Sequence, residues 1–439
     1  MLIRTSAGCS KPIICVAEQL VQTFEQQNVH ELISLQESLN SCLCRDDFNG
    51  ALIVLRKLCL RENLDVDHFR NLGLLYQFCG RLDCSLRSLF CALRIDGLHA
   101  SSHYTISKQI KYKKYPSLAK RLKSIDLEVY GSNKDRIKIC FAKSNLFHQC
   151  GDYEASARWL ERGNGLRLLD AGSDRCQIQA VGDFRVALAS QSPVDNHGSG
   201  LASGRGLIFV VGLPRCGSTL LDAILCMSEK VGDLGECCEF EKVFASRMRS
   251  GWTNGSLELL GKDYLRSARK HRKDEFLVDK SLFNFINVGL ILRCLPQAKI
   301  IHCKRNPFAH ALSLYRANIF PGSTFSSSLE DIAEMIVYER RLVSLFADQF
   351  PGKIFSLKYE EMVVSPSLVL RDLVEWLGLD WTDNFLCHHR SNLITQTASR
   401  VQVRHPIGSQ SLELWRSYSR MLRPMKQVLG QSMDVLDLF

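Results

Sequence analysis

The sequence predicts an α/β fold, a P-loop-like parallel sheet covered by helices, preceded by an all-helical region. After residue 206, short apolar runs alternate with segments whose apolar residues recur with helical spacing. Before residue 190 the apolar residues show helical spacing alone. Residues 190–206 contain eight Gly or Ser and no apolar period, which is typical of a linker. We therefore divide the chain into a helical region (1–189), a linker (190–206) and an α/β domain (207–439).

The helical region is weakly repetitive. The pattern Phe48-x-x-Ala51 recurs as Leu82-x-x-Ser85 after 34 residues, the period of a tetratricopeptide repeat. The glycine turn at Gly80 is followed 71 residues later by a similar turn at Gly151. These intervals predict tetratricopeptide-like pairs of antiparallel helices and a possible protein partner; an irregular helical bundle is the alternative.

The α/β domain shows four strand-like runs. They are residues 207–211, 276–278, 299–303 and 354–358. Between them, apolar stripes that begin at Val288, Phe308 and Leu370 predict amphipathic helices. This alternation predicts a parallel sheet that binds its ligand at the carboxyl ends of the strands.

The segment 207–221 predicts a phosphate site. It reads as an apolar strand, a turn bounded by Gly212 and Gly217, and a helix opened by Ser218. Backbone N–H groups at a helix N-terminus bind anions. Ser218 stands where a nucleotide triphosphatase has its lysine, which argues against ATP or GTP hydrolysis. An ordinary strand–turn–helix is the plain alternative.

A second anion site follows the third predicted strand. Arg305 supplies a bidentate fork, and Pro307 suits the first turn of a helix that carries Ser313. With Arg215 in the first loop, the two loops would hold a nucleotide phosphorylated at both ends of its ribose.

Residues 206–420 resemble the sulfotransferases that use 3′-phosphoadenosine-5′-phosphosulfate (PAPS). The resemblance is strongest to the bacterial type with an N-terminal tetratricopeptide region, and extends to the tyrosylprotein sulfotransferases. Five motifs in the family's order carry it. They are residues 214–219, Gly235-Glu236, Asp279-Lys280, Arg305 with Ser313, and residues 359–366 together with a C-terminal loop at 397–406 and Trp415-Arg416.

The resemblance implies roles for individual residues. The 5′-phosphosulfate site would comprise Arg215, Cys216, Gly217, Ser218 and Thr219. The 3′-phosphate site would use Arg305 and Ser313, while Tyr359, Ser399 and Arg404 would complete the nucleotide site. Glu236 would be the general base, with Lys280, Arg215 and Ser399 stabilising charge on the transferring group and leaving phosphate.

Several positions depart from the family pattern, among them Ser228-Glu229, which stands where a His-Pro is common and leaves the chemistry untouched. Cys216 replaces a serine and Ser218 a threonine, changes that keep the backbone donors of the loop. Leu414 and Ala317 stand where relatives have basic residues, so a phosphate contact is missing or comes from Arg404 or Arg416.

The expected reaction is therefore sulfuryl transfer from PAPS to an acceptor hydroxyl, with no metal. A P-loop kinase is a rival within the same class, although the kinase lysine is absent. A rival of another class is a nucleotide-binding tetratricopeptide scaffold whose transferase half is inactive. Retention of Arg215, Glu236, Lys280 and Arg305 together favours an active enzyme.

The acceptor stays open between a protein, a glycan and a small alcohol. The net charge of +10 favours anionic ligands. Residues 108–123 hold seven basic residues and no acidic one, which is either a solvated helical face or a docking surface for an acidic acceptor. No nucleic-acid recognition motif accompanies these charges.

The sequence also gives an expectation about compartment. No apolar run reaches the ~20 residues that span a membrane, and no secretory leader is evident. The eighteen cysteines are scattered, and we interpret them as reduced packing residues of a cytoplasmic protein. Cys42/Cys44 and Cys237/Cys238 lack zinc-like partners, although a metal or redox role for these pairs is the alternative.

Overall fold

The structure is a computed structural model. It describes residues 34–43, 47–60, 65–191, 203–253, 255–270, 272, 274–319, 323–390, 408 and 412–432. The chain divides into two compact units, Met1–Gln109 and Ile110–Phe439. The boundary predicted at residues 190–206 lies inside the second unit and mostly outside the described residues, so the three-part division stays a prediction.

The first unit is helical where it is described. Its helices are α2 (Phe48–Cys59), α3 (Val66–Phe78), α4 (Leu82–Ile95) and α5 (Ala100–Ser107). Gly80 adopts a left-handed φ of 74° in the turn between α3 and α4, as its sequence position predicts. Leu55, Leu58 and Leu75 are buried in a core that α2 and α3 share.

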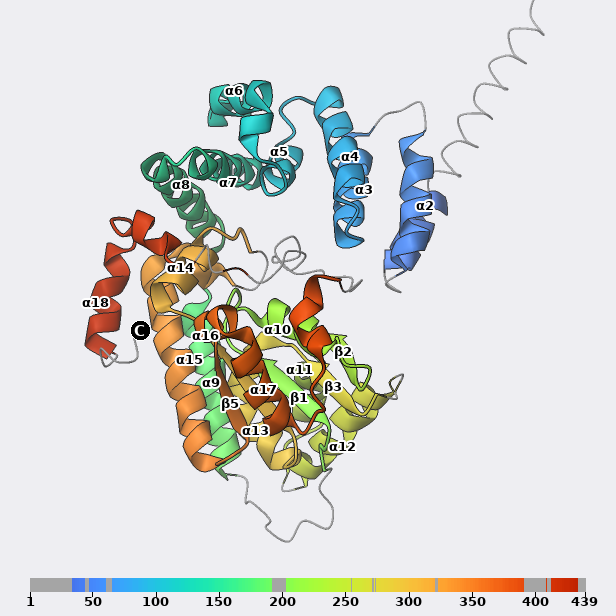
Figure 1. The fold of residues 1–439 in the computed structure, drawn as a ribbon, viewed down its shortest axis with the longest axis vertical. Coiled ribbons are helices and arrows are strands. Elements are labelled where there is room, and N and C mark those ends of the chain that lie inside the picture. Colours follow the sequence, from blue (N-terminus) through green and yellow to red (C-terminus); the bar gives the residue numbers. More distant parts are fainter. Residues whose placement is uncertain are drawn as a thin grey trace, which may run out of the picture. The chain divides into compact units, whose positions relative to one another are not determined.

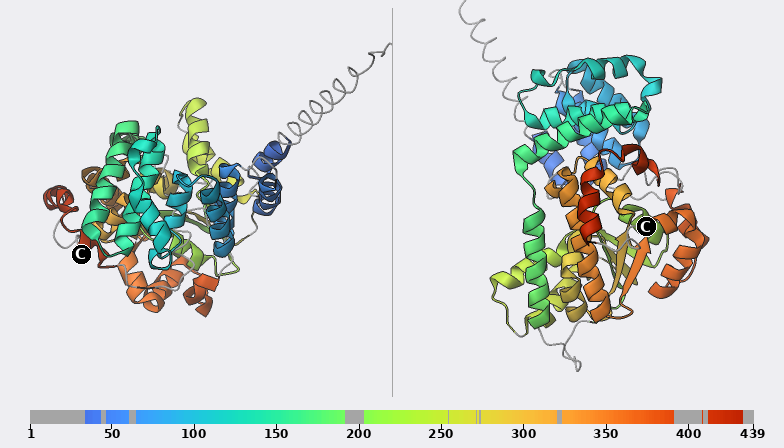
Figure 2. Two further views of the ribbon diagram at one scale, coloured as in Figure 1. Left: turned by 90° about the horizontal axis from the view of Figure 1, so that it is seen from above. Right: turned by 90° about the vertical axis from the view of Figure 1, so that its left-hand side faces the viewer.

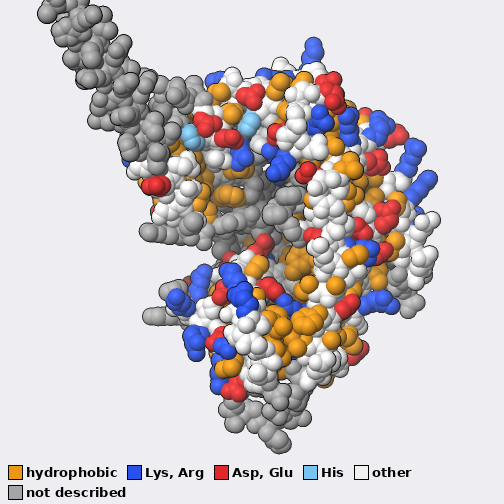
Figure 3. Space-filling model, turned by 180° about the vertical axis from the view of Figure 1, so that it is seen from behind, with side chains coloured by type: hydrophobic (Ala, Val, Ile, Leu, Met, Phe, Trp, Pro, Cys, Tyr) orange, Lys and Arg blue, Asp and Glu red, His pale blue; other side chains and the backbone are white. Residues whose placement is uncertain are grey.

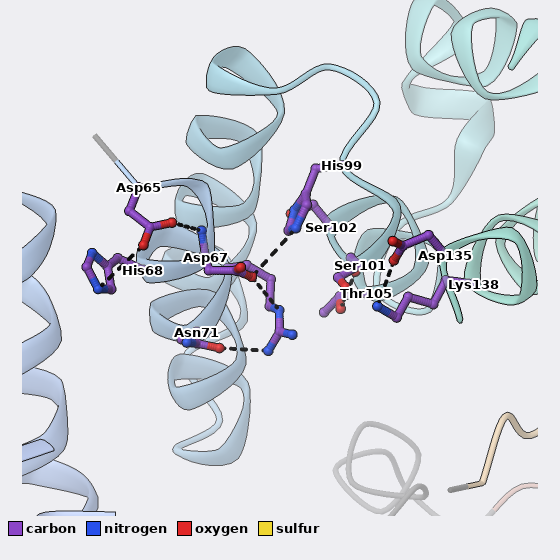
Figure 4. Close-up of polar contacts among 11 residues, drawn as sticks. Asp65, Asp67, His68, Asn71, His99, Ser101, Ser102, Thr105, Asp135 and Lys138 are labelled. Carbon is purple, nitrogen blue, oxygen red and sulfur yellow. Dashed lines mark hydrogen bonds and ion pairs between the residues drawn. The ribbon is translucent and has the colours of Figure 1, made fainter. Parts of the chain in front are cut away.

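Polar contacts join α3 to the start of α5 (Figure 4). Asp65 caps α3 by accepting from the Asp67 amide at 2.8 Å. The Asp67 carboxylate lies 3.6 Å from His99 Nε2, and His99 Nδ1 is 2.8 Å from Ser102 Oγ. The helices of this unit are therefore tied by side chains as well as by their apolar core.

The second unit begins with more helices. They are η1 (Tyr112–Lys114), α6 (Pro116–Ser124), η2 (Leu127–Val129), α7 (Asn133–Gln149), α8 (Tyr153–Ala171) and α9 (Arg175–Gln191). Gly151 turns between α7 and α8 with a φ of 78°, as predicted. Asn164 and Arg167 of α8 are buried and donate to the backbone carbonyls of Tyr315 and Ile319. The repeat class of all these helices stays a prediction.

The sheet of the second unit has five parallel strands in the order β2-β3-β1-β4-β5 (Figure 1). The strands are β1 (Leu207–Val211), β2 (Val231–Gly235), β3 (Phe276–Asp279), β4 (Lys299–Lys304) and β5 (Ile354–Lys358). Four of them match the predicted runs. The sequence prediction missed β2, because two glycines and an aspartate, residues that strands disfavour, make up most of it.

Helices cover both faces of this sheet (Figures 1 and 2). The helical elements that follow β1 are α10 (Ser218–Leu225), α11 (Glu239–Arg249), α12 (Ser256–Arg269), η3 (Leu282–Asn287), α13 (Val288–Cys294), α14 (Pro307–Tyr315), η4 (Thr324–Ser327), α15 (Leu329–Gln349), α16 (Tyr359–Val364), α17 (Pro366–Leu377), η5 (Asp383–Arg390), η7 (Leu414–Tyr418) and α18 (Arg423–Ser432). Of these, η7 and α18 pack against other helices.

The alternation of side chains along β1 divides the core into two layers. Ile208 and Val210 belong to a cluster with residues of α10, α17 and η5. Phe209 points to the opposite face, where its ring contacts Phe240 of α11 and Tyr264 of α12. Helix α9 runs beside α15 at the edge of this second layer (Figures 1 and 2). The predicted fold class, a helix-covered parallel sheet after an all-helical region, is confirmed.

Candidate active site

The predicted site residues gather at the carboxyl edge of the sheet. Each of the five strands is followed within a few residues by one of them, in the chain order Arg215, Glu236, Lys280, Arg305 and Tyr359. Because the strands are parallel, these positions share one edge, where open α/β sheets bind ligands.

The first loop, residues 212–217, joins β1 to α10 in a constrained backbone. Arg215 has a left-handed φ of 72°, an uncommon conformation for a residue with a side chain. Gly217 has a φ of 107°, and a side chain at this position would overlap the ring of Tyr359. Such strain is typical of ligand clamps, and here it brings the N-terminus of α10 to the sheet edge.

The thiol of Cys216 points away from this edge. Its side chain is buried in the core cluster below the sheet edge, and its backbone N–H donates to Leu213 within the turn at 3.3 Å. Ser218 and Thr219, at the start of α10, are also buried. The side chain of Cys216 therefore packs in the core, where its thiol contacts Cys303 and Ser218.

Hydrogen bonds connect the first loop to the second. Arg215 Nε donates to Ser313 Oγ at 3.1 Å, and Arg305 Nη1 donates to the Arg215 carbonyl at 3.0 Å. Asn306 caps α14, its side chain accepting from two backbone amides of the first turn. The two predicted phosphate loops thus form one continuous structure.

Tyr359 closes the side of this structure next to β5. The guanidinium carbon of Arg305 lies 4.6 Å from the centre of the Tyr359 ring, a cation–π contact. The neighbouring Glu360 accepts from the Asn306 amide at 2.9 Å. Arg305 Nε is buried and has no hydrogen-bond partner among the described residues.

Lys280, which follows β3, and Glu236, which follows β2, contact each other. Lys280 Nζ donates to Glu236 Oε1 at 3.0 Å and lies 3.7 Å from Asp222 Oδ2. The Lys280 side chain is 4% exposed, whereas that of Glu236 is 53% exposed. Burial alone would lower the pKa of Lys280, but the Asp222 and Glu236 carboxylates outweigh it and raise this pKa above its usual value.

Local backbone turns hold Glu236 in place. Gly235 has a φ of 68°, and its amide donates to Asp233 Oδ1 at 2.5 Å. Cys238 also has a left-handed φ, and its amide donates to Ser281 Oγ at 3.0 Å. The loop between β2 and α11 is therefore tied to the residues that follow β3, which keeps the glutamate near Lys280.

The C-terminal part of the predicted site is only partly described. Ser399 and Arg404 lie outside the described residues. Trp415 stacks on Phe308 of α14, with ring centres 5.0 Å apart. Arg416 pairs with Glu413. Relatives have basic residues at the positions of Leu414 and Ala317. No contact among the described residues identifies a basic side chain that takes their place.

Sequence reasoning missed two residues that the structure places at this site. His310 Nε2 lies 2.8 Å from the Pro214 carbonyl, and burial lowers the pKa of this histidine to about 4. The neutral ring therefore donates to the first loop. Asp222 lies beside Lys280, and its only sequence signal is a single carboxylate in the apolar helix α10.

The described residues hold no metal-binding cluster, no membrane-spanning helix and no disulfide. No group of three or more His, Cys, Asp or Glu side chains is arranged to hold a metal ion within the described ranges. No helix in the described part of the chain is long and apolar enough to cross a membrane. The cysteines in those ranges are free thiols.

Comparisons with known proteins agree with the motifs. The sequence model of the Sulfotransferase family matches residues 256–383. An uncharacterized protein of Aquifex aeolicus is 32% identical over 251 residues, 52% of this chain and 33% of that protein. Protein-tyrosine sulfotransferase 2 of Gallus gallus is 23% identical over 246 residues, 48% of this chain and 62% of that protein. The chain thus spans less than two thirds of the length of these relatives.

Among solved structures, the sulfotransferase domain of the Synechococcus PCC 7002 olefin synthase aligns with a TM-score of 0.40 and 17% identity, covering 56% of this chain and 99% of that domain. The sequence matches confirm that this chain is related to the sulfotransferase family and, within it, to the tyrosylprotein sulfotransferases.

Proposed function

We propose that the protein transfers the sulfuryl group of PAPS to an acceptor hydroxyl. One observation carries this proposal: Arg215, Glu236, Lys280 and Arg305 follow four different strands and meet at one sheet edge. The relatives that are named as protein-tyrosine sulfotransferases support the reaction class. The contact between Lys280 and Glu236 speaks against a binding scaffold that has lost its chemistry.

The residues present fit a nucleotide with phosphates at both ends of its ribose. The first amides of α10 have no carbonyl partner within the helix and suit the 5′-phosphosulfate, together with Arg215. Arg305 and Ser313 suit the 3′-phosphate, and the buried Nε of Arg305, which has no partner within the described part of the chain, offers a donor. By resemblance, Ser399 and Arg404 would add contacts from the C-terminal loop.

PAPS would supply the sulfuryl group, and the protein's own part is positioning and electrostatics. Glu236 would take the proton of the acceptor hydroxyl as the acceptor oxygen forms its bond to sulfur and the bond from sulfur to the nucleotide phosphate breaks. Its exposed carboxylate is accessible to an acceptor. Lys280 orients that carboxylate and would stabilise negative charge on the sulfuryl oxygens.

The surface charge supports an acidic acceptor or partner. Lys113, Lys114, Lys120 and Arg121, on η1 and α6, are exposed, and no described acid forms an ion pair with them. Leu122 anchors α6 from its opposite side. On the face that Figure 3 displays, Lys and Arg side chains are interspersed with Asp and Glu side chains. We infer that this basic face docks an acidic acceptor, preferably a protein, given the names of the relatives.

The helical first unit would serve as a surface for a protein partner, as its repeat-like hairpins indicate. This role rests on the tetratricopeptide resemblance and on the paired helices α3 and α4.

Nucleotide selectivity tests the proposed function. Calorimetry should show that adenosine 3′,5′-bisphosphate binds much more tightly than ATP with magnesium, because the loop around Arg305 has no 3′-phosphate to bind in ATP. Equal or tighter binding of ATP would contradict the sulfotransferase assignment. Chelating divalent metal should leave the affinity for the bisphosphate unchanged.

A further inference from the structure

Asp222, a buried carboxylate of α10, has no role in the mechanism above. It is 7% exposed and lies about one turn into the helix that opens the phosphate site. Its Oδ2 is 3.7 Å from Lys280 Nζ, and its Oδ1 is 3.9 Å from Cys226 Sγ. Lys280 therefore lies between two carboxylates, Asp222 on one side and Glu236 on the other.

The charges around this ammonium do not balance when all groups are ionised. Asp222 interacts with Asp233 and with Glu236, and all three carboxylates interact with Lys280, so three negative charges face one positive charge. The helix η5, which packs against α10, adds His388 as a buried titratable side chain. An incoming phosphosulfate would meet this excess of negative charge beside the loop that binds it.

Protonation of one carboxylate would remove part of that repulsion. Burial, then repulsion by Asp233, raises the pKa of Asp222 to about 7, although Lys280 acts in the opposite direction. A bound anion adds negative charge nearby and raises this pKa further. Near neutral pH, the carboxylate of Asp222 is therefore a group whose protonation state a bound nucleotide can change.

We propose that Asp222 is a positioning residue that takes up a proton from solvent when an anionic nucleotide binds to the first loop. The neutral carboxyl then releases Lys280 from one of its two partners, so that the ammonium can pair with the bound anion while it keeps Glu236. This inference rests on the proposed function, which supplies the anion.

The sign of the effect follows from linkage. Binding that takes up a proton strengthens as pH falls through the range between the two pKa values of Asp222, free and bound. The nucleotide's own phosphates titrate near pH 6. The window from pH 7 to 8.5 therefore isolates the contribution of the protein.

Calorimetry of the full chain with adenosine 3′,5′-bisphosphate, in buffers of different ionisation enthalpy, counts the protons taken up. On binding the bisphosphate at pH 7.5, the wild type should take up a substantial fraction of one proton. In Asp222→Asn this fraction should be absent. The slope of log Kd against pH should differ between the two by up to about one. Asp222→Glu should keep the uptake, and Asp372→Asn, which removes an exposed carboxylate of α17, should match the wild type.

Equal proton uptake by the wild type and a folded Asp222→Asn would overturn the inference. If Asp222→Asn does not fold, the wild type provides the test. Its proton uptake on bisphosphate binding must change with pH near neutrality. If the wild type takes up no proton at any pH between 6.5 and 9, the inference is overturned. Absence of bisphosphate binding in the wild type would instead contradict the proposed function.

Discussion

Arg215 Nε donates to Ser313 Oγ across 3.1 Å, joining the loop after β1 to the helix after β4. The two residues are 98 positions apart in the sequence. Arg305 adds a second link by donating to the Arg215 carbonyl. Binding of a nucleotide to one loop should therefore affect the position of the other loop.

Replacing Glu236 with glutamine should separate chemistry from binding. The variant Glu236→Gln keeps the size of the side chain and removes the base, so bisphosphate affinity should stay near the wild-type value. Turnover should fall by about 10²–10⁴, or roughly 3–5 kcal/mol of transition-state free energy. Steady-state rates with a working acceptor, beside calorimetry, measure both. Glu229→Gln, an exposed glutamate before β2, is the matched control and should retain full activity.

Removing Arg305 should affect nucleotide binding first. Loss of a charged hydrogen bond costs roughly 1.5–3 kcal/mol, so Arg305→Ala should weaken the bisphosphate about 10- to 100-fold. The loss should be smaller for adenosine 5′-monophosphate, which has no 3′-phosphate. Arg371→Ala, an exposed arginine of α17, provides the control. An equal loss for both nucleotides would assign Arg305 to holding the loop rather than to binding the 3′-phosphate.

Adding one methyl group at Gly217 should disrupt the site. In Gly217→Ala, the new methyl group would overlap the ring of Tyr359, and the alanine would need a φ of 107°. In Gly378→Ala, the alanine would also need a positive φ, of 76°, but its methyl group would have no neighbour within 4 Å. The first variant should lose bisphosphate binding and more thermal stability than the second. An equal loss of thermal stability in the two variants, with bisphosphate binding kept in both, would contradict the close packing of the first loop against Tyr359.

Two histidines, the half-buried His148 and the buried His310, should make the fold sensitive to acid. Burial lowers the pKa of His148 to about 3, with a further effect from Arg316, and burial lowers that of His310 to about 4. In the unfolded chain these groups bind protons near pH 6.5, so the unfolded state holds more protons between about pH 6.5 and 3. Their contribution to stability is present above pH 6.5 and is lost as pH falls through that window.

The contacts of His148 give the physical reason. Arg316 Nη1 donates to His148 Nε2 at 3.2 Å, so this nitrogen must stay unprotonated to accept. The Nδ1–H then donates to Tyr418 at 2.8 Å. The melting temperature should fall between pH 7 and 5, and His148→Gln should lower it at pH 7 but flatten the fall. An unchanged pH dependence in the variant would assign the acid sensitivity elsewhere.

Charge reversal on the basic face of η1 and α6 should weaken binding of the acceptor and leave binding of the nucleotide unchanged. Reversing Lys113 and Lys114 to glutamate should raise KM for an acidic acceptor several-fold, with the effect shrinking at high salt. Bisphosphate affinity should not change, because these residues belong to no phosphate loop. Reversal of Lys353, a lysine before β5, serves as the charge control. An unchanged KM would mean that this face is only a solvated surface.

The fold class could be predicted from the sequence, because apolar strand-like runs alternate with helical stripes. Arg215, Lys280 and Arg305 follow predicted strands, so the parallel order of those strands brings them to one edge, whereas Glu236 is assigned by family resemblance alone. The strand β2 escaped because it contains Gly232, Asp233 and Gly235, which break the apolar pattern.

Other features depend on tertiary contacts that no local pattern contains. His310 and Asp222 face the loop only because α14 and α10 pack in particular orientations. The orientation of Cys216 toward the core could not be read from a motif in which its serine counterpart suggested a polar role. The unit boundary at Gln109 lies between helical segments and lacks a Gly/Ser-rich stretch like that at residues 190–206.

Transfer of labelled sulfate tests the central claim most directly. The full chain is incubated with PAPS labelled in its sulfuryl group and with a panel of acidic peptides, glycans and small alcohols, beside Glu236→Gln. The account predicts label on an acceptor hydroxyl and equimolar adenosine 3′,5′-bisphosphate with the wild type, and a loss of about 10²–10⁴ with the variant. A wild type that binds neither PAPS nor the bisphosphate, or a variant that transfers label at the wild-type rate, would contradict it.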